Sequence, residues 1–174
     1  MMDNVEILIT EEDVRKRIQE MADFLSEEYA GKEVTLVGIL NGSVFFITAL
    51  AQAMSIPVTI DFMSCSSYGA GTESSGHVII EKDLSNPVKG KHIIIAEDIV
   101  DTGHTLSLVK EMLEEREPAS LAVATLLDKP ERREVSFEAD YVGFEIPNAF
   151  VVGWGLDYDQ KYRDLNFVGV INND

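Results

Sequence analysis

The sequence predicts an α/β protein with a parallel-sheet core flanked by helices. Short runs rich in branched apolar residues alternate with helical patterns through the first three quarters of the chain, and that order produces parallel strands covered on both faces. Hydrophobic residues make up 45% of the 174 residues, which is enough for a sizeable core. A chain of this length suits a single domain, so we expect one domain over 1–174.

The first elements are expected to be two helices and two strands. Residues 10–13 have the spacing of a capping box, and apolar residues then recur at helical intervals until Gly31. The branched apolar run 34–40 predicts a buried strand, and the almost wholly apolar stretch 44–54 predicts a buried helix. Residues 57–63 predict the next strand.

The segment 64–76 is expected to be a long mobile loop. It contains five Ser, three Gly and one Thr, and Tyr68 is almost its only large side chain, so it cannot pack a core of its own. Long loops of this composition are usually either functional or merely disordered.

Three further strands and a helix are expected in the second half of the core. Residues 77–81 and 91–96 predict strands, and the second leads through several acids into a helix at about 103–117. A proline directly after that helix ends it, and 121–127 predicts another branched apolar strand.

The last quarter of the chain has a less regular pattern. Its short apolar pieces are separated by Pro, Gly and Asp, and they lie at 141–144, 150–154 and 167–171. We expect a core of about 30–128 and a small hood subdomain, built from the N-terminal segment and about 129–174.

Composition excludes several classes of protein. The chain carries 31 acids and 14 bases, a formal net charge of -17, and binding to nucleic acid or to anionic membranes depends on clusters of Lys and Arg. The single Cys65 excludes an internal disulfide and a multi-cysteine metal site. We see neither a secretory signal nor an apolar run that could span a bilayer, and we therefore expect a cytoplasmic protein.

The segment 93–106 carries the strongest chemical signal. An apolar strand runs directly into Glu97 and Asp98, and a short loop with Asp, Thr and Gly then opens a helix. Ligands of parallel sheets bind beyond the carboxyl ends of the strands. The amides of Thr102 to Thr105 at the helix start, with two hydroxyls and a glycine, predict a phosphate cradle that needs no lysine.

The two adjacent acids narrow the ligand further. Carboxylates repel phosphate but accept hydrogen bonds from sugar hydroxyls, and they also bind hard divalent cations. A phosphoribosyl group fits both parts of the segment. The alternative for Asp101-Thr102-Gly103 alone is an ordinary helix cap. Kinase and dinucleotide patterns are absent, because 38–43 lacks the Walker lysine and no Gly-x-Gly-x-x-Gly follows a strand.

Residues 97–105 resemble the phosphoribosyl pyrophosphate motif of the type I phosphoribosyltransferases. The later strings 141–147, 150–158 and 162–165 are similar to the hypoxanthine-guanine branch of that family. The resemblance covers about 34–171. It implies a magnesium-dependent purine salvage reaction, in which a 6-oxopurine (hypoxanthine, and also guanine) displaces pyrophosphate from phosphoribosyl pyrophosphate to give IMP or GMP.

The resemblance also implies roles for individual residues. Asp101 would be the general acid/base near the purine N7. The phosphoribosyl group would be held by Glu97, Asp98, Thr102, Gly103, His104 and Thr105. Pyrophosphate would contact Asn41, Gly42, Arg133 and Arg163, and the purine would contact Lys129, Phe150, Val151 and Asp157. Mg²⁺ would be bound by Glu97, Asp98 and Asp157.

Further expectations concern the lid, the assembly and the departures from the family. Ser67-Tyr68 resembles the pair at the tip of the family's flexible lid, and the resemblance implies homodimers or homotetramers. Asn41 stands where relatives often carry a basic residue, so only backbone amides are expected to help there. Taken singly, Lys129 and Arg133 are more typical of solvated surface charges.

Two other functions are compatible with parts of the pattern. A regulator could keep this fold to sense phosphoribosyl pyrophosphate while binding RNA or DNA, although the net charge of -17 opposes that function. A phosphoribosyltransferase for another base is the second, and the Phe150 segment with Lys129 opposes it.

Overall fold

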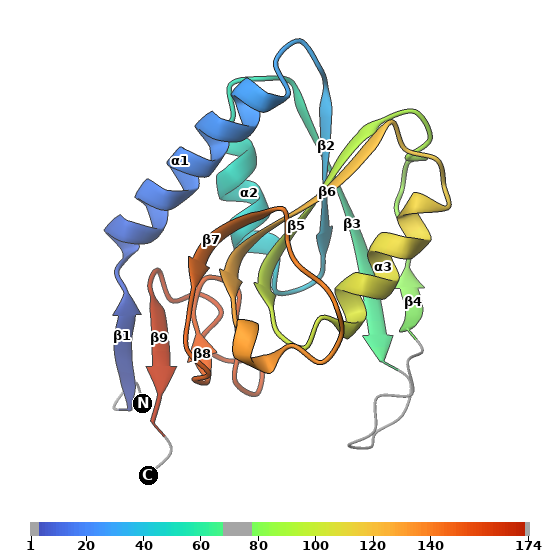
Figure 1. Ribbon diagram of the computed structural model, residues 1–174. Helices are drawn as coiled ribbons and strands as arrows, with labels where there is room; N and C mark the ends of the chain where they lie inside the picture. Colours follow the sequence, from blue (N-terminus) through green and yellow to red (C-terminus); the bar gives the residue numbers. More distant parts are fainter. Residues whose placement is uncertain (1–3, 68–77, 173–174) are drawn as a thin grey trace.

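A six-stranded sheet forms the centre of the computed structural model, which describes residues 4–67 and 78–172 (Figure 1). Five of its strands are parallel, and β4 at one edge is antiparallel to β3. In spatial order the strands are β4 (Val78–Lys82), β3 (Val58–Ser67), β2 (Val34–Ile39), β5 (His92–Val100), β6 (Ser120–Asp128) and β7 (Tyr141–Glu145). The predicted α/β class with a parallel sheet is confirmed.

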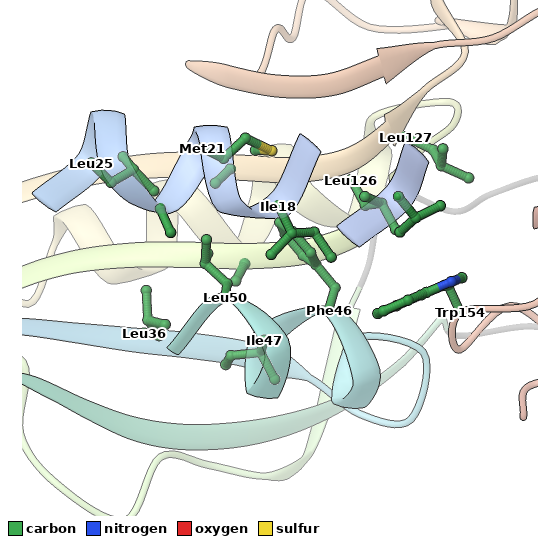
Figure 2. Close-up of a cluster of buried hydrophobic side chains, with 14 of the residues drawn as sticks. Ile18, Met21, Leu25, Leu36, Phe46, Ile47, Leu50, Leu126, Leu127 and Trp154 are labelled. Carbon is green, nitrogen blue, oxygen red and sulfur yellow. The ribbon is translucent and has the colours of Figure 1, made fainter. Parts of the chain in front are cut away.

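Helices cover both faces of this sheet. Helices α1 (Glu11–Glu28) and α2 (Val44–Ala53) lie on one face, and α3 (His104–Glu114) lies on the other (Figure 1). Figure 2 shows how the first face is filled: side chains of α1 and α2 meet those of β2 and β6 and the ring of Trp154. A short 3-10 helix, η1 (Pro130–Arg132), follows β6.

The N-terminal cap of α1 confirms the expected helix start. The hydroxyl oxygen of Thr10 accepts a hydrogen bond from the amide of Asp13 at 3.2 Å. Three acidic residues lie in the first turn, where their negative charges interact favourably with the positive end of the helix dipole. Gly31, with φ of 79°, follows the helix end where the sequence predicts it.

A second, three-stranded sheet joins the two ends of the chain. Its strands β1 (Val5–Ile9), β9 (Val168–Ile171) and β8 (Val151–Val152) are antiparallel. Strand β7 lies in the main sheet, although the sequence pattern grouped it with the irregular last quarter. As an edge strand it is only half-buried, so its apolar pattern is weak.

Two strands are longer than the sequence pattern indicates. Strand β3 continues through Ser67, inside the expected loop, because its polar end pairs with β4 from Ser64↔Lys82 to Ser67↔Val78. The rest of that expected loop, including Tyr68, falls outside the described residues. Strand β5 continues through Val100, so Glu97 and Asp98 lie within the strand and not after it.

In residues 4–67 and 78–172, no helix has both the length and the apolar character needed to cross a membrane.

Neighbouring phenylalanines on α2 provide a test of the packing in Figure 2. Phe46 is fully buried, whereas Phe45 is 39% exposed. We expect Phe46→Ala to lower the free energy of unfolding by about 3–5 kcal/mol, since it leaves a cavity in the core. Phe45→Ala is the matched control and should cost much less. Urea unfolding of both variants measures the difference, and equal losses would contradict the assignment of the core.

Candidate functional site

The predicted site residues converge at the carboxyl ends of three neighbouring strands. Strand β5 pairs in parallel with β2 on one side and with β6 on the other, so the loops that follow these strands meet at one edge of the sheet. The segment around β8 approaches the same edge, because Val151, Leu156 and Asp157 line a cavity together with Asp101 and Lys129.

Two buried carboxyl groups, adjacent in sequence, lie near the carboxyl end of β5. Glu97 is 9% exposed and Asp98 is 8% exposed. An oxygen of Asp98 accepts from the amide of Ile99 at 2.8 Å, but Oε1 of Glu97 has no hydrogen-bond partner among the described residues. A buried oxygen without a donor is costly, and a ligand hydroxyl or a cation would satisfy it.

Burial shifts the protonation of both carboxyl groups. Burial raises the pKa of Glu97 well above its ordinary value, and the neighbouring Asp98 charge raises it further. Burial also raises the pKa of Asp98 to about 6, against the hydrogen bond from Ile99. The charge of Arg163 lowers the pKa of Asp98, and that of Asp157 raises it.

The loop after β2 packs directly on Asp98. A Cβ on Gly42 would lie 2.1 Å from Oδ2 of Asp98, and a Cβ on Gly155, which has φ of 97°, would lie 1.9 Å from the carbonyl oxygen of Gly42. Position 155 therefore requires glycine, and a side chain at position 42 would displace the Asp98 carboxylate. Asn41, which follows Leu40 through a cis peptide bond, is exposed.

The loop after β5 leads into the start of α3. Gly103 is the N-cap residue with φ of 89°, and its carbonyl accepts from the amide of Ser107 at 2.9 Å. The amide of His104 points to the hydroxyl of Thr102 at 3.4 Å. The first amides of an α-helix have no partner inside the helix, and its dipole favours an anion there. Thr105 lies on this first turn and is exposed.

A cavity of about 320 Å³ brings the expected purine contacts together with the expected acid/base. The predicted residues that line it are Asp101, Lys129, Phe150, Val151 and Asp157. Four further lining residues were missed from the sequence, and they are Ile99, Arg132, Asn148 and Leu156. The only signal in the sequence that could have indicated these four residues is that they lie close to predicted site residues along the chain.

Lys129 and Asp101 present opposite charges to this cavity. Lys129 is only 8% exposed, so it is not a solvated surface charge. Burial lowers the pKa of its ammonium group, while the charge of Asp101 raises it. The carboxylate of Asp101 is half-exposed and pairs with Nε of Arg132 at 3.1 Å.

An exposed aromatic pair lies beside the cavity. Phe150 is 48% and Tyr158 is 49% exposed, and their rings meet edge to face with centroids 5.6 Å apart. Edge contact leaves the flat face of a ring free for stacking. Tyr158 had no role predicted from the sequence.

Arg163 ties the segment after β8 to the same region. Its guanidinium donates to the carbonyl of Gly155 at 2.6 Å and pairs with Asp157 at 3.3 Å. Asp157 also accepts from the amide of Gln160 at 2.9 Å. Arg163 is therefore near the acids, but much of its hydrogen-bonding capacity is used within the protein.

The structure does not place Arg133 with the other expected pyrophosphate contacts. Its guanidinium donates to the backbone carbonyl of Asp101 at 2.5 Å and to the carboxylate of Asp128, and it does not line the cavity. The side chains of Arg133 and Asp128 are each 15% exposed, so this charge is not solvated either.

The expected metal ligands do not form a closed metal site. Within 4–67 and 78–172, no three Asp, Glu, His or Cys side chains gather into a group that could hold a metal ion. The expected set of Glu97, Asp98 and Asp157 stays a prediction. The donors are nevertheless carboxylates, which suit Mg²⁺. Magnesium usually takes only one or two protein carboxylates and completes its shell with water and substrate phosphates.

The lid residues can be described only in part. Ser67 is the last residue of β3. Tyr68 falls outside the described residues, so the expected lid stays a prediction.

Known proteins are similar to this chain over nearly its full length. The model of the phosphoribosyl transferase domain family matches residues 5–160. The hypoxanthine phosphoribosyltransferase of Haemophilus influenzae is 47% identical over 171 residues, which is 97% of this chain and 96% of the relative. The hypoxanthine-guanine phosphoribosyltransferase of Streptococcus pneumoniae is 45% identical over 97% of this chain and 93% of its own. A crystal structure of a Staphylococcus aureus hypoxanthine phosphoribosyltransferase superimposes with a TM-score of 0.96 at 45% identity, covering 99% of this chain and 94% of that one.

The raised pKa of Asp98 predicts a pH dependence of stability. A carboxyl group whose pKa rises from 3.8 unfolded to about 6 folded contributes stability below its unfolded pKa, and that contribution is lost as pH rises through about 6. Asp98→Asn removes this pH-dependent loss of stability, because an amide does not ionise. In metal-free buffer we expect the variant to gain about 2 kcal/mol relative to the parent between about pH 4 and about pH 8. Urea unfolding at both pH values measures the change, and a constant difference would contradict the raised pKa.

Proposed function

The chain belongs to the type I phosphoribosyltransferase family, and from that premise we propose that it transfers the 5-phosphoribosyl group of phosphoribosyl pyrophosphate to a 6-oxopurine. The proposed bases are hypoxanthine and guanine, and the products are IMP or GMP and pyrophosphate. One observation carries the proposal. A cavity lined by Asp101, Lys129 and Phe150 lies next to two buried carboxyl groups and a helix start, and this set suits a planar base and a ribose phosphate together.

The phosphoribosyl group would bind along the loop that follows β5. Its 5-phosphate would accept hydrogen bonds from the amides and hydroxyls between Thr102 and Thr105 at the start of α3. Its ribose hydroxyls would donate to Glu97 and Asp98. The unpaired Oε1 of Glu97 supports this part, since a sugar hydroxyl is the kind of donor that it lacks.

The purine would bind in the 320 Å³ cavity. Phe150 would stack on the base, and the buried ammonium group of Lys129 would donate to the 6-oxygen. The backbone of Val151 would read the edge of the ring. A buried lysine in a small cavity can strongly favour a base that carries a 6-oxygen over a base that lacks one. Without that oxygen the buried ammonium group would lose its hydrogen-bond acceptor, which is costly.

Asp101 would act as general base on the purine and as general acid in the reverse reaction. When N9 attacks C1 of the ribose, the C1–O bond to pyrophosphate breaks and a purine proton is lost to the Asp101 carboxylate. The transition state carries positive charge on the ribose ring. The carboxyl groups of Glu97 and Asp98 would stabilise that charge when they are ionised.

Pyrophosphate would leave toward the loop after β2. The backbone amides of Asn41 and Gly42 and the guanidinium of Arg163 are its proposed contacts, and the Asn41 side chain adds no charge. Mg²⁺ is the proposed cofactor, held by Asp157 and by Glu97 and Asp98 together with substrate oxygens, and it would neutralise charge on the departing pyrophosphate.

The broader expectations belong to the same proposal. We propose a single domain with a hood that includes the small sheet, a lid at 64–76, and a homodimer or homotetramer in the cytoplasm. A net charge of -17 supports the absence of a nucleic-acid partner.

The proposed activity is tested by release of pyrophosphate from phosphoribosyl pyrophosphate. Hypoxanthine, guanine and xanthine are supplied in parallel, with excess magnesium and in a matched sample with a chelator. We expect turnover with hypoxanthine and a loss of turnover when magnesium is removed. Folded protein that turns over none of the three bases would refute the proposal.

Replacement of the acid/base gives a second test. Asp101→Asn should lower kcat by about two to four orders of magnitude, because the amide cannot accept the purine proton. Binding of ribose 5-phosphate should change little, since that ligand does not use the carboxylate. Steady-state kinetics and calorimetry measure the two effects, and an unchanged kcat would exclude Asp101 from proton transfer.

A further inference from the structure

Three consecutive residues, beginning with the last residue of η1, lie against the loop that carries the proposed acid/base. Nε of Arg132 pairs with the carboxylate of Asp101 at 3.1 Å, and the guanidinium of Arg133 donates to its backbone carbonyl at 2.5 Å. The amide of Glu134 then donates to the carbonyl of Thr102 at 3.0 Å. Each residue of 132–134 thus holds a different group of the loop.

The same segment continues along the loop toward α3. The carboxylate of Glu134 forms a hydrogen bond with Nε2 of His104 at 2.7 Å. A Cβ on Gly103 would lie 3.1 Å from both Cδ of Arg133 and Cγ2 of Val135. The aliphatic stem of Arg133 therefore packs under the glycine at the helix start, and little space remains between them.

Arg133 is the member of this segment that links two strand ends. Its second terminal nitrogen pairs with Asp128, the last residue of β6, whereas its first holds the carbonyl of Asp101, just beyond β5. Both charged side chains are only 15% exposed, so water screens the pair weakly. The backbone of Lys129 adds a further tie, since its amide donates to the carbonyl of Val100 at 3.0 Å.

These contacts fix the spacing between the two charged groups of the base cavity. Asp101 follows β5 and Lys129 follows β6, and Arg133 bonds to the backbone of the first and to the side chain of Asp128 beside the second. A planar guanidinium can hold two acceptors at fixed directions, whereas an ammonium group presents a single nitrogen.

We infer that Arg133 is a positioning residue for the phosphoribosyl loop and not a contact for pyrophosphate. The inference rests on the proposed function for the identity of the ligand. Arg133 bonds to the loop without lining the cavity, and both of its terminal nitrogens already have protein acceptors. Its loss would let the loop 101–104 shift, and the shift would weaken binding of the 5-phosphate and misplace Asp101.

Two ligands separate a positioning residue from a pyrophosphate contact. Arg133→Lys should raise the calorimetric Kd for ribose 5-phosphate by about tenfold, the loss expected when a charged hydrogen bond that orders the loop is removed. The Kd for pyrophosphate with excess magnesium should stay within about twofold. The fitted stoichiometry reports the folded fraction, so partial misfolding cannot imitate the result.

Asp128→Asn and Arg116→Lys complete the design. Asp128→Asn should reproduce part of the loss and add little to Arg133→Lys, because both changes break the same link. Arg116→Lys is the control: Arg116 forms a two-point ion pair with Asp83 at 2.9 and 3.0 Å, beyond the other end of α3, and both Kd values should match those of the parent.

Three results would overturn the inference. In the first, Arg133→Lys weakens the binding of pyrophosphate alone, which would make Arg133 a pyrophosphate contact. In the second it weakens the binding of both ligands equally, and in the third it changes neither Kd. Failure of the proposed function is a separate result, because it is seen when the parent binds ribose 5-phosphate but turns over no 6-oxopurine.

Discussion

Two buried carboxyl groups at the end of β5 constrain the rest of the site. Glu97 and Asp98 are less than a tenth exposed, and one of their oxygens has no partner in the described parts of the chain. Their burial follows from the sheet, because β5 lies between β2 and β6 and Asp98 is covered by Gly42. Gly42 is covered in turn by Gly155, so three segments far apart in sequence meet over one carboxylate. The fold thus maintains a costly, incompletely satisfied pair that a ribose and a cation would complete.

Arginine has a mainly internal role in this acidic chain. Arg163 bonds to the carbonyl of Gly155 and pairs with Asp157, and Arg17 donates to two carbonyls of the edge strand β7 at 2.8 Å each. With a net charge of -17, the protein offers few free cations to a polyphosphate. Helix-start amides, a buried Lys129 and bound magnesium would therefore supply the positive field. The acidic residues of the site explain only a small part of the excess of acids over bases, and the remaining acids favour solubility.

Periodicity and local capping made most of the fold predictable. The helix that begins after Thr10 and the buried strands have strong patterns, whereas β7 is a half-buried edge strand with a weak one, and the end of β3 is polar because only its pairing with β4 stabilises it. Within the site, the residues that belong to sequence motifs were predicted as a group, and the cavity brings five of them together. The position of Arg133 against the loop was not predictable, because its partners Asp128 and the Asp101 carbonyl depend on how two strands are spaced in three dimensions.

We propose that ligand binding ionises the buried pair, because burial raises the pKa of both Glu97 and Asp98. Proton release on binding tests it most directly. Phosphoribosyl pyrophosphate with magnesium is titrated into the parent and into Asp98→Asn near pH 6, by calorimetry in buffers of different ionisation enthalpy. If ribose hydroxyls and the cation favour the ionised carboxylates, the parent releases more protons per ligand bound than the variant does. Equal proton release by the two proteins would contradict a protonated pair that ionises to bind the ligand.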